Sequence, residues 1–408
     1  MAVYGCSLTR LLRGFIVLLM IVIYNDTRFS SASIDRNVLV ASIQQATDQF
    51  NINLPVGSPA QKLQLKIDVE SPSTAIRCSS NSSSAFDPFL SSSFRSRRSL
   101  HGETCTVRPV YPAQHGCKCA HDTVNLYIQR TAFPDALLSA NVTAVSFACC
   151  KGRLGGDTDA GVAGFGRGDK SLPMQISKRA GLAYQFSYCL PSIAFFGRVS
   201  SYAYLNPPIG QLQTLIATPQ TNLYYRKNGG YAFKLTNITI SGEVLKYPIM
   251  MGISTTQRYT TLQAGVYETF RENFRKAVEY EKTAMPAVAP FDTCFNTTYL
   301  YQREPQPGPY LKQPGVGFRN EGDESWTLYP ETVLARSKGS SSPLACMAFL
   351  KAKPKQISVL GWFQQLDCLL QFDIENSLFG IRSIFSPYAI RPEVPRCNTL
   401  LYPLFPST

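Results

Sequence analysis

The residue whose position most strongly suggests chemistry is Asp68, which ends the run Leu65-Lys66-Ile67-Asp68. Leu63, Leu65 and Ile67 alternate with polar residues, and this spacing predicts a half-buried strand. A carboxylate at the point where a strand becomes a loop is where a scaffold can present a catalytic group. Asp is also a standard turn residue, so a surface turn is the alternative.

A second group of reactive side chains lies between His115 and His121, where two histidines flank Cys117 and Cys119. These residue types are zinc ligands in many proteins. In an oxidising compartment, cysteines pair as disulfides instead. For a secreted chain we therefore expect no metal here, and nothing in the sequence indicates a cofactor.

Three further motifs have simple explanations. Gly164, Gly166 and Gly168 could suggest a phosphate loop, but the Lys-Ser/Thr continuation is missing, so we expect a turn. The tripeptide Arg167-Gly168-Asp169 is treated as a chance occurrence. A small basic group is expected to be a solvated loop; it comprises Arg95, Arg97 and Arg98.

The N-terminus predicts secretion. Arg10 and Arg13 precede the apolar run Gly14–Tyr24, and small residues follow at Ser30–Ser33. This order is typical of a secretory signal peptide, which we place at residues 1–33. The run is about half of the ~20 residues that a membrane-spanning helix needs, so an uncleaved anchor is the minority alternative. After cleavage we expect a monomer in the extracellular space or cell wall, with no membrane contact.

Cysteine usage agrees with secretion. The chain has 12 cysteines, and Cys6 lies within the signal peptide, so the number that remains is odd. We expect mostly disulfides, with one thiol free or paired between chains. The pairing among six of them stays open: Cys78, Cys105, Cys117, Cys119, Cys149 and Cys150. Four sequons predict glycosylated surface loops, at Asn81, Asn141, Asn237 and Asn296.

Length and composition favour two β-rich lobes. A chain of 408 residues with 44% hydrophobic and 12% aromatic residues can form two packed cores, and 27 Pro with 27 Gly indicate many loops. The net charge of +13 allows nucleic-acid binding, but no basic helix, zinc-finger spacing or aromatic–basic motif is present. Retention on an anionic matrix such as pectin suits a secreted basic chain better.

Periodicity predicts mainly strands. Phe270, Phe274 and Val278 stand at helical spacing and predict an amphipathic helix over 266–280, and a short helix is expected near 171–176. Strands are expected at 38–44, 49–54, 61–68, 122–130, 144–149, 186–190, 231–240, 242–247, 345–350, 357–363 and 369–373. A Pro/Gly-containing link over 206–220 separates an N-terminal lobe, 34–222, from a C-terminal lobe, 223–408.

The two halves of the chain repeat one pattern. Ile67-Asp68-Val69 is followed roughly a hundred residues later by Val162-Ala163-Gly164, and Ile253-Ser254-Thr255 is followed at a similar interval by Val359-Leu360-Gly361. A repeated β lobe with a polar residue at a strand end predicts an all-β protein of two lobes with a cleft between them. A few short helices complete this expectation.

These residues resemble the plant pepsin-like aspartic peptidases of the nepenthesin type, over about Phe50 to Cys397. They are closest to the non-proteolytic branch, which contains xylanase inhibitors, extracellular dermal glycoproteins and basic seed globulins. The motifs that carry the resemblance are Phe86-Asp87-Pro88 with Ser91–Phe94, Ala163–Gly168 with Ser171-Leu172 and Gln175, Phe186–Pro191, Val266-Tyr267, Cys294-Phe295, Val359–Trp362, and Gln371–Asp373 with Leu378–Gly380. The resemblance implies a bilobal pepsin-like double β-barrel.

The departures from this family concern catalysis. The first catalytic motif, Asp-Thr-Gly in the family, reads Asp68-Val69-Glu70, and the second, Asp-Ser-Gly-Thr, reads Ser254-Thr255-Thr256-Gln257. Pepsin-type chemistry needs two carboxylates that share one proton. A Ser254 hydroxyl cannot take a proton from water at useful pH, and Asp68 alone cannot be acid and base in one step. We expect Glu70 to crowd the loop rather than replace the missing acid, and we expect no proteolysis.

Other implications of the resemblance concern the flap and the disulfides. In the family the flap hairpin lies just before Asp122, and we expect it to be deleted in this chain. The resemblance pairs Cys189 with Cys397 and Cys294 with Cys346, and it leaves Cys368 as the candidate free thiol. All three histidines (His101, His115, His121) lie in the N-terminal half, so inhibition that relies on a C-terminal histidine is unsupported.

The resemblance implies a secreted, catalytically silent protein that binds another extracellular protein, with a microbial glycoside hydrolase such as a xylanase as the expected partner in plant defence. One alternative is an aspartic endopeptidase with an atypical dyad. Another is a receptor or storage protein that binds a peptide or carbohydrate.

Overall fold

The computed structural model describes the two lobes and their junction. The described residues are 34–80, 84–96, 117–130, 139–152, 154, 160–198, 221–302, 310–311, 314–328, 330–336, 343–383 and 397. The predicted signal peptide, Asn81, Cys105, His101, His115, and the predicted link over 206–220 lie outside them. The lobe boundary at 222/223 therefore stays a prediction.

Strands dominate the described residues, and they form four sheets. The largest has 13 strands, which run in the spatial order β11 (Thr221–Asn222), β27 (Leu378–Ser383), β26 (Cys368–Asp373), β9 (Gln185–Cys189), β10 (Ile193–Gly197), β1 (Ile34–Gln45), β2 (Phe50–Val56), β3 (Gln61–Asp68), β8 (Gly161–Gly164), β4 (Ala75–Arg77), β7 (Ser139–Cys150), β6 (Cys117–Arg130) and β5 (Arg95–Ser96).

The second sheet has eight strands in the described part of the chain: β21 (Ser325–Thr327), β20 (Val316–Asn320), β13 (Tyr231–Ile240), β14 (Glu243–Ile253), β25 (Ser358–Leu360), β15 (Thr260–Leu262) and β24 (Phe349–Lys351), with β12 (Tyr224–Tyr225) beside β13. The smaller sheets are β16 (Ala284–Met285), β17 (Cys294–Asn296), β23 (Leu344–Met347) and β22 (Leu334–Arg336), and the pair β18 (Tyr301–Gln302) and β19 (Tyr310–Leu311).

Helices are few and short within the described residues. They are α2 (Leu172–Ala180), α3 (Ala264–Ala277), α4 (Tyr280–Thr283) and α5 (Pro330–Val333), with the 3-10 turns η1 (Pro88–Leu90), η4 (Thr297–Leu300) and η5 (Trp362–Gln365). None of the helices in this part of the chain has the length and apolar character to cross a membrane.

The local sequence explains the main elements. Leu63, Leu65 and Ile67 of β3 are buried, while Lys62 and Gln64 on the opposite face of the strand are exposed, as the alternation predicts. Helix α3 buries Val266, Tyr267, Phe270 and Phe274 on one face, which confirms the predicted amphipathic helix, although it starts at Ala264 and ends at Ala277. Helix α2 ends at Gly181, whose φ of 68° provides a left-handed C-cap.

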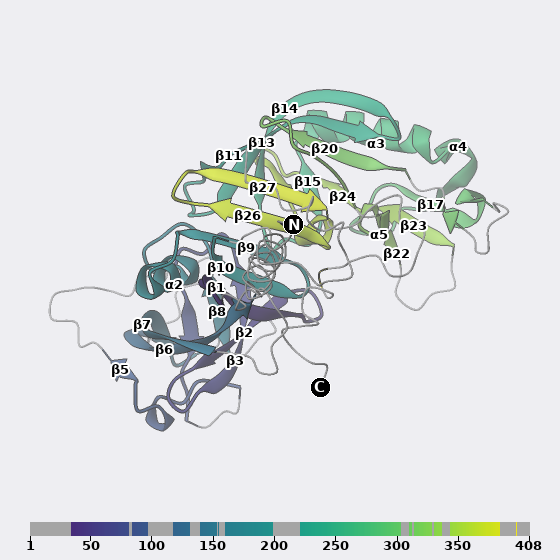
Figure 1. Cartoon of the computed structure of the whole chain (residues 1–408). Coiled ribbons are helices and arrows are strands. Elements are labelled where there is room, and N and C mark those ends of the chain that lie inside the picture. Colours follow the sequence, from purple (N-terminus) through teal and green to yellow (C-terminus); the bar gives the residue numbers. More distant parts are fainter. Residues whose placement is uncertain are drawn as a thin grey trace, which may run out of the picture.

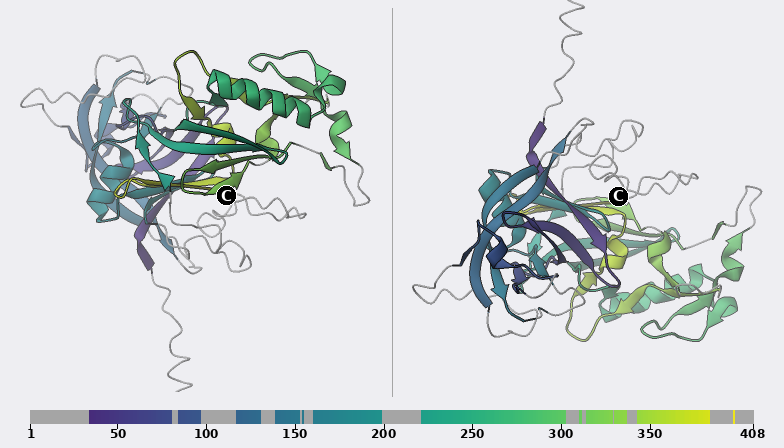
Figure 2. Two further views of the ribbon diagram at one scale, coloured as in Figure 1. Left: turned by 90° about the horizontal axis from the view of Figure 1, so that it is seen from above. Right: turned by 90° about the horizontal axis from the view of Figure 1, so that it is seen from below.

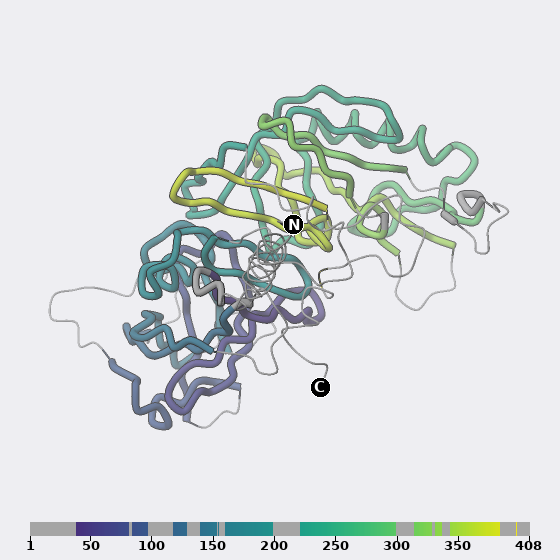
Figure 3. Tube along the Cα trace, in the orientation of Figure 1, coloured from purple at the N-terminus to yellow at the C-terminus, as the bar shows by residue number. Residues whose placement is uncertain are grey.

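The predicted all-β architecture of two lobes is confirmed, and the lobes share a sheet (Figure 1; Figure 3 shows the same arrangement as a trace). The yellow strands β26 and β27 come from the C-terminal half, and β26, which pairs with β27, also pairs with β9 of the N-terminal lobe. Helix α3 covers one face of the second sheet (Figure 2). At the junction, Phe50 packs edge-on against Trp362, with ring centroids 5.1 Å apart. The shared sheet therefore fixes how the lobes sit against each other.

One predicted strand was too long. The strand expected over 357–363 ends at Leu360, and the 3-10 turn η5 begins at Trp362. Gly361 lies between them, close to the backbone of Tyr259, so the chain turns there. The strand expected over 122–130 starts earlier, because β6 pairs with β7 from Cys117 onward.

Candidate functional site

The strand pairing brings the repeated motifs into the same geometry in both lobes. In the N-terminal lobe, β3 runs parallel to β8, with Ile67 opposite Ala163 and Asp68 opposite Gly164. In the C-terminal lobe, β14 runs parallel to β25, with Ile253 opposite Leu360. In each lobe, a central strand thus ends beside a parallel strand of apolar residues that is followed by, or ends in, glycine. The internal repeat that the sequence indicates is a structural repeat.

The glycines of these pairs allow backbone segments to touch. A Cβ at Gly164 would lie 2.2 Å from the carbonyl oxygen of Ser73, and a Cβ at Gly361 would lie 2.5 Å from the carbonyl carbon of Tyr259. Both distances are far below any real contact. The Gly run is therefore a close-packed turn against the loop after Asp68, as expected, and not a phosphate loop.

Asp68 is fully buried at the end of β3. Its Oδ1 accepts a hydrogen bond of 2.8 Å from the backbone N–H of Glu70, while no donor among the described residues reaches Oδ2. Burial raises the pKa of this carboxyl, and the negative charge of Glu70 raises it further, whereas the Glu70 N–H and Lys66 act in the opposite direction. Asp68 is thus a buried carboxyl with a raised pKa, and one of its oxygens accepts no hydrogen bond from the described residues.

Ser254 occupies the matching place at the end of β14 and is also buried. Its hydroxyl donates a 2.8 Å hydrogen bond to Oε2 of Glu70 and accepts from the backbone N–H of Gln257 at 3.2 Å. The hydroxyl is therefore engaged by the loop after Asp68 and by its own loop. It supplies no second acid.

Glu70 corrects one expectation from the sequence. Instead of crowding its loop, the side chain reaches the C-terminal lobe, where Oε1 accepts from Arg226 at 2.6 Å and from the Asn228 amide at 3.1 Å. Gly252 leaves room for this pair, because a Cβ there would lie 3.1 Å from the guanidinium of Arg226. Both carboxylate oxygens of Glu70 are bonded to protein donors. No pattern in the sequence indicates Arg226 or Asn228, which lie far from Glu70 in the chain.

Thr255 ties the two loops together through backbone groups. Its hydroxyl donates to the carbonyl oxygen of Ile67 at 2.9 Å and accepts from the N–H of Val69 at 3.2 Å. Val69 holds the matching position in the N-terminal lobe, and its apolar side chain cannot return such bonds. Of the two hydroxyl bridges that two equivalent loops could form, only the bridge from Thr255 is present among the described residues.

The prediction of a deleted flap stays untested. Strands β5 and β6 pair at Arg95–His121 and Ser96–Ala120, and the connecting residues 97–116 lie outside the described part of the chain.

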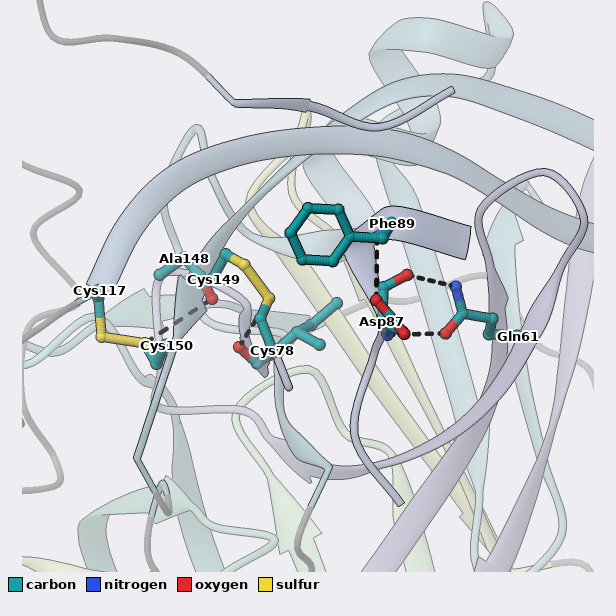
Figure 4. Close-up of a disulfide and its surroundings, with 9 residues drawn as sticks. Gln61, Cys78, Asp87, Phe89, Cys117, Ala148, Cys149 and Cys150 are labelled. Carbon is teal, nitrogen blue, oxygen red and sulfur yellow. Dashed lines mark hydrogen bonds between the residues drawn. A yellow bond between two sulfur atoms is a disulfide. The ribbon is translucent and has the colours of Figure 1, made fainter. Parts of the chain in front are cut away.

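Disulfides account for the cysteine-rich segment. Cys78 is bonded to Cys149 and Cys117 to Cys150 (Figure 4), and Cys119 is also disulfide-bonded. Within the described residues, no group of His, Cys, Asp and Glu side chains could hold a metal ion. The zinc interpretation is thus disfavoured for Cys117 and Cys119.

The remaining cysteines pair between distant segments. Cys189 is bonded to Cys397 and Cys294 to Cys346, the same pairs that the resemblance implies. Cys368 is free and buried, and burial raises the pKa of its thiol to about 12. Of the described sequon residues, Asn141 is exposed, while Asn237 and Asn296 are partly exposed.

Comparisons with known proteins agree with this geometry. The family models described as "Xylanase inhibitor N-terminal" and "Xylanase inhibitor C-terminal" match residues 50–198 and 230–383. "Aspartyl protease 25" of Oryza sativa subsp. japonica is 27% identical over 385 residues, which cover 82% of this chain and 82% of that protein. "Gamma conglutin 1" of Prunus dulcis is 26% identical over 384 residues, which cover 85% and 86%.

A solved structure supports the fold. The crystal structure of conglutin gamma, a basic 7S globulin from lupine seeds, superposes with a TM-score of 0.69 at 20% identity, covering 89% of this chain and 98% of that one. At this identity the likeness concerns the fold alone, and it agrees with a pepsin-like bilobal architecture.

Proposed function

Because this chain belongs to the plant pepsin-like family that the two xylanase-inhibitor models describe, we propose that it is a secreted protein without protease activity that binds another extracellular protein. The partner class that the family models favour is a glycoside hydrolase such as a xylanase, and the role is defence in the plant cell wall. Secretion is supported by the predicted signal peptide and by the disulfides, which persist in oxidising compartments.

The observation that carries this proposal is the state of the second catalytic position. Ser254 stands there, and its hydroxyl donates to Glu70, whose other oxygen is bonded by Arg226 and Asn228. Peptide hydrolysis of the pepsin type needs two carboxyls that share a proton and hold a water between them. Among the described residues Asp68 has no such partner, because both oxygens of the nearby Glu70 already accept hydrogen bonds from the C-terminal lobe.

Two assays on one preparation test this proposal. The first measures cleavage of a denatured protein at acid pH with and without pepstatin, and we expect no pepstatin-sensitive cleavage. The second measures binding and inhibition for a panel of microbial endoxylanases and endoglucanases, and we expect at least one to bind at micromolar protein. Pepstatin-sensitive cleavage, or no binding across the panel, would count against the proposal.

A second candidate function is an aspartic endopeptidase with an atypical dyad. It is favoured by one observation: the pKa of Asp68 is raised, mainly by burial and further by the charge of the nearby Glu70 carboxylate. In that case Asp68→Asn would abolish acid proteolysis and Glu70→Gln would reduce it. If cleavage appears and both variants keep it, the activity belongs to a contaminant.

A further inference from the structure

Two large apolar side chains stand in solvent on one fixed turn of the N-terminal lobe. Phe89 is 90% exposed and its neighbour Leu90 is 61% exposed, both on the 3-10 turn η1. A single exposed apolar residue is ordinary. Two adjacent ones at these exposures are not, because together they leave an aromatic ring and a branched chain in water with no packing of their own. The segment Asp87–Ser91 is called the Phe-Leu turn below.

The Phe-Leu turn is held rigidly on its N-terminal side. The amide of Gln61 forms two hydrogen bonds with the backbone of Asp87, one to the carbonyl oxygen and one from the N–H, each 2.8 Å. The Asp87 carboxylate then accepts from the N–H of Phe89 at 2.9 Å (Figure 4). The polar residues of the turn are therefore used to fix the backbone that presents the ring.

The turn is also anchored to the core and at its C-terminal side. Phe86, directly before it, is fully buried and packs edge-on against Phe147, with ring centroids 5.9 Å apart. The hydroxyl of Ser91 accepts from the N–H of Ser58 at 3.0 Å. A side chain on a preordered backbone loses little conformational entropy when it is buried by a partner, and this rigidity is what a recognition residue requires.

The charge around the turn indicates what it meets. Arg95 is exposed, and its guanidinium is held by the carbonyl oxygens of Ser92 at 2.9 Å and Phe94 at 2.8 Å. The carboxylate of the turn itself, on Asp87, is bonded to the N–H of Phe89, and among the described residues no carboxylate pairs with Arg95. The whole chain carries +13, so a second copy of it would be repelled, whereas an acidic protein would be attracted.

We propose that the Phe-Leu turn is a docking site, in which Phe89 and Leu90 enter an apolar pocket with an acidic rim on the partner protein. Arg95 faces the acidic rim. This inference rests on the proposed binding function and takes the same partner class, now restricted to acidic glycoside hydrolases. Binding hot spots are commonly aromatic or Arg anchors that fill a pocket on the partner and exclude water.

The test uses the full chain and the panel of endoxylanases and endoglucanases, chosen to include acidic and basic members, with affinity measured by biolayer interferometry. In the double variant Phe89→Ser/Leu90→Ser, we expect affinity for the acidic binder to fall by about 30-fold or more. The matched control is Val288→Ser, which removes an apolar side chain 45% exposed in the C-terminal lobe, and there we expect a change within about twofold. Circular dichroism of both variants checks the fold.

Charge reversal tests the rim. Arg95→Glu should slow association with the acidic binder, and added salt should shrink the difference. Full affinity in Phe89→Ser/Leu90→Ser would overturn the docking site while the binding function stands. No binding by any panel member would overturn both. Binding of the chain to vesicles with 30% phosphatidylserine that depends on Phe89, without hydrolase binding, would overturn the protein partner in favour of a lipid surface.

Discussion

The Asp68 loop and the Ser254 loop hold equivalent places in the two lobes, yet one keeps the carboxyl and the other keeps the hydroxyl that bridges the loops. Both follow a strand that runs parallel to an apolar–Gly strand. The N-terminal loop keeps the carboxyl but has Val69 where a hydroxyl would bridge the loops. The C-terminal loop keeps the bridging hydroxyl of Thr255 but has Ser254 where the second carboxyl would stand.

This difference indicates that the backbone of the two loops can be held in place without the pair of catalytic acids. The backbone of both loops is held by strand pairing, close glycine contacts and Thr255, none of which needs a catalytic acid. The position of the missing acid is used for a link between the lobes, through Ser254, Glu70 and Arg226. Changing these side chains one at a time therefore tests which of them hold the two loops together.

The largest expected effect comes from restoring the second acid alone, as Ser254→Asp. The new carboxylate would stand in a buried place beside the Glu70 carboxylate and close to Asp68, so we expect a loss of about 3 kcal/mol in the free energy of unfolding at pH 7. Urea denaturation measures it. The additional change Glu70→Gly should recover most of the loss.

The control for this experiment is Ser254→Asn, which has the same size without the charge. If Ser254→Asp is as stable as Ser254→Asn at pH 7, Glu70 does not fill the place of the missing acid.

The next effect concerns the hydroxyl that bridges the loops. Thr255→Val removes the partner of the Ile67 carbonyl and of the Val69 N–H, both buried, and we expect a loss of about 2 kcal/mol in unfolding free energy. Thr255→Ser keeps the hydroxyl and should lose less than half as much. Equal losses in the two variants would mean that the methyl group, and not the bridge, matters.

The third prediction concerns pH. Because the pKa of Asp68 is raised in the folded protein, its contribution to stability is present below the ordinary pKa of 3.8 and is lost as pH rises through the raised value. Asn at this position has no proton to lose and can still accept from the Glu70 N–H. We expect Asp68→Asn to raise the melting temperature by about 2–4 °C at pH 7 and by less at pH 3. A difference that is constant with pH would contradict the raised pKa.

Much of the framework could be predicted from the sequence, because it depends on local pattern. The alternation that ends at Asp68 gave β3 with its bounds unchanged, and the helical spacing of Phe270 and Phe274 gave α3. The two apolar–Gly segments were recognised as a repeat, since close backbone contact requires glycine at fixed places. The free state of Cys368 also agrees with the sequence-based expectation.

The contacts that decide the chemistry could not be predicted, because they join residues distant in the chain. Glu70 at a glycine position predicts crowding from sequence alone, and only the fold shows that Arg226 stands opposite it. Likewise, nothing in the sequence of β26 indicates that it pairs with β9 in the other lobe. Long-range partners of polar side chains depend on the tertiary arrangement and have no periodic signal.

The smallest effect, and the sharpest test of the link between lobes, is the coupling of Glu70 and Arg226. Their side chains are 17% and 27% exposed and 2.6 Å apart, so solvent weakens the ion pair. In a double-mutant cycle of urea unfolding with Glu70→Gln and Arg226→Met, we expect a coupling free energy of about 0.5–1 kcal/mol. The exposed pair Lys282 and Glu279 on a single turn, 2.8 Å apart, provides a matched cycle in which we expect a smaller coupling. Coupling at Glu70 and Arg226 that is no larger than in this surface pair would mean that Glu70 merely fills space. A larger coupling would show that Glu70, the acid of the N-terminal loop, holds this loop to the C-terminal lobe, in which Ser254 stands at the place of the second catalytic acid.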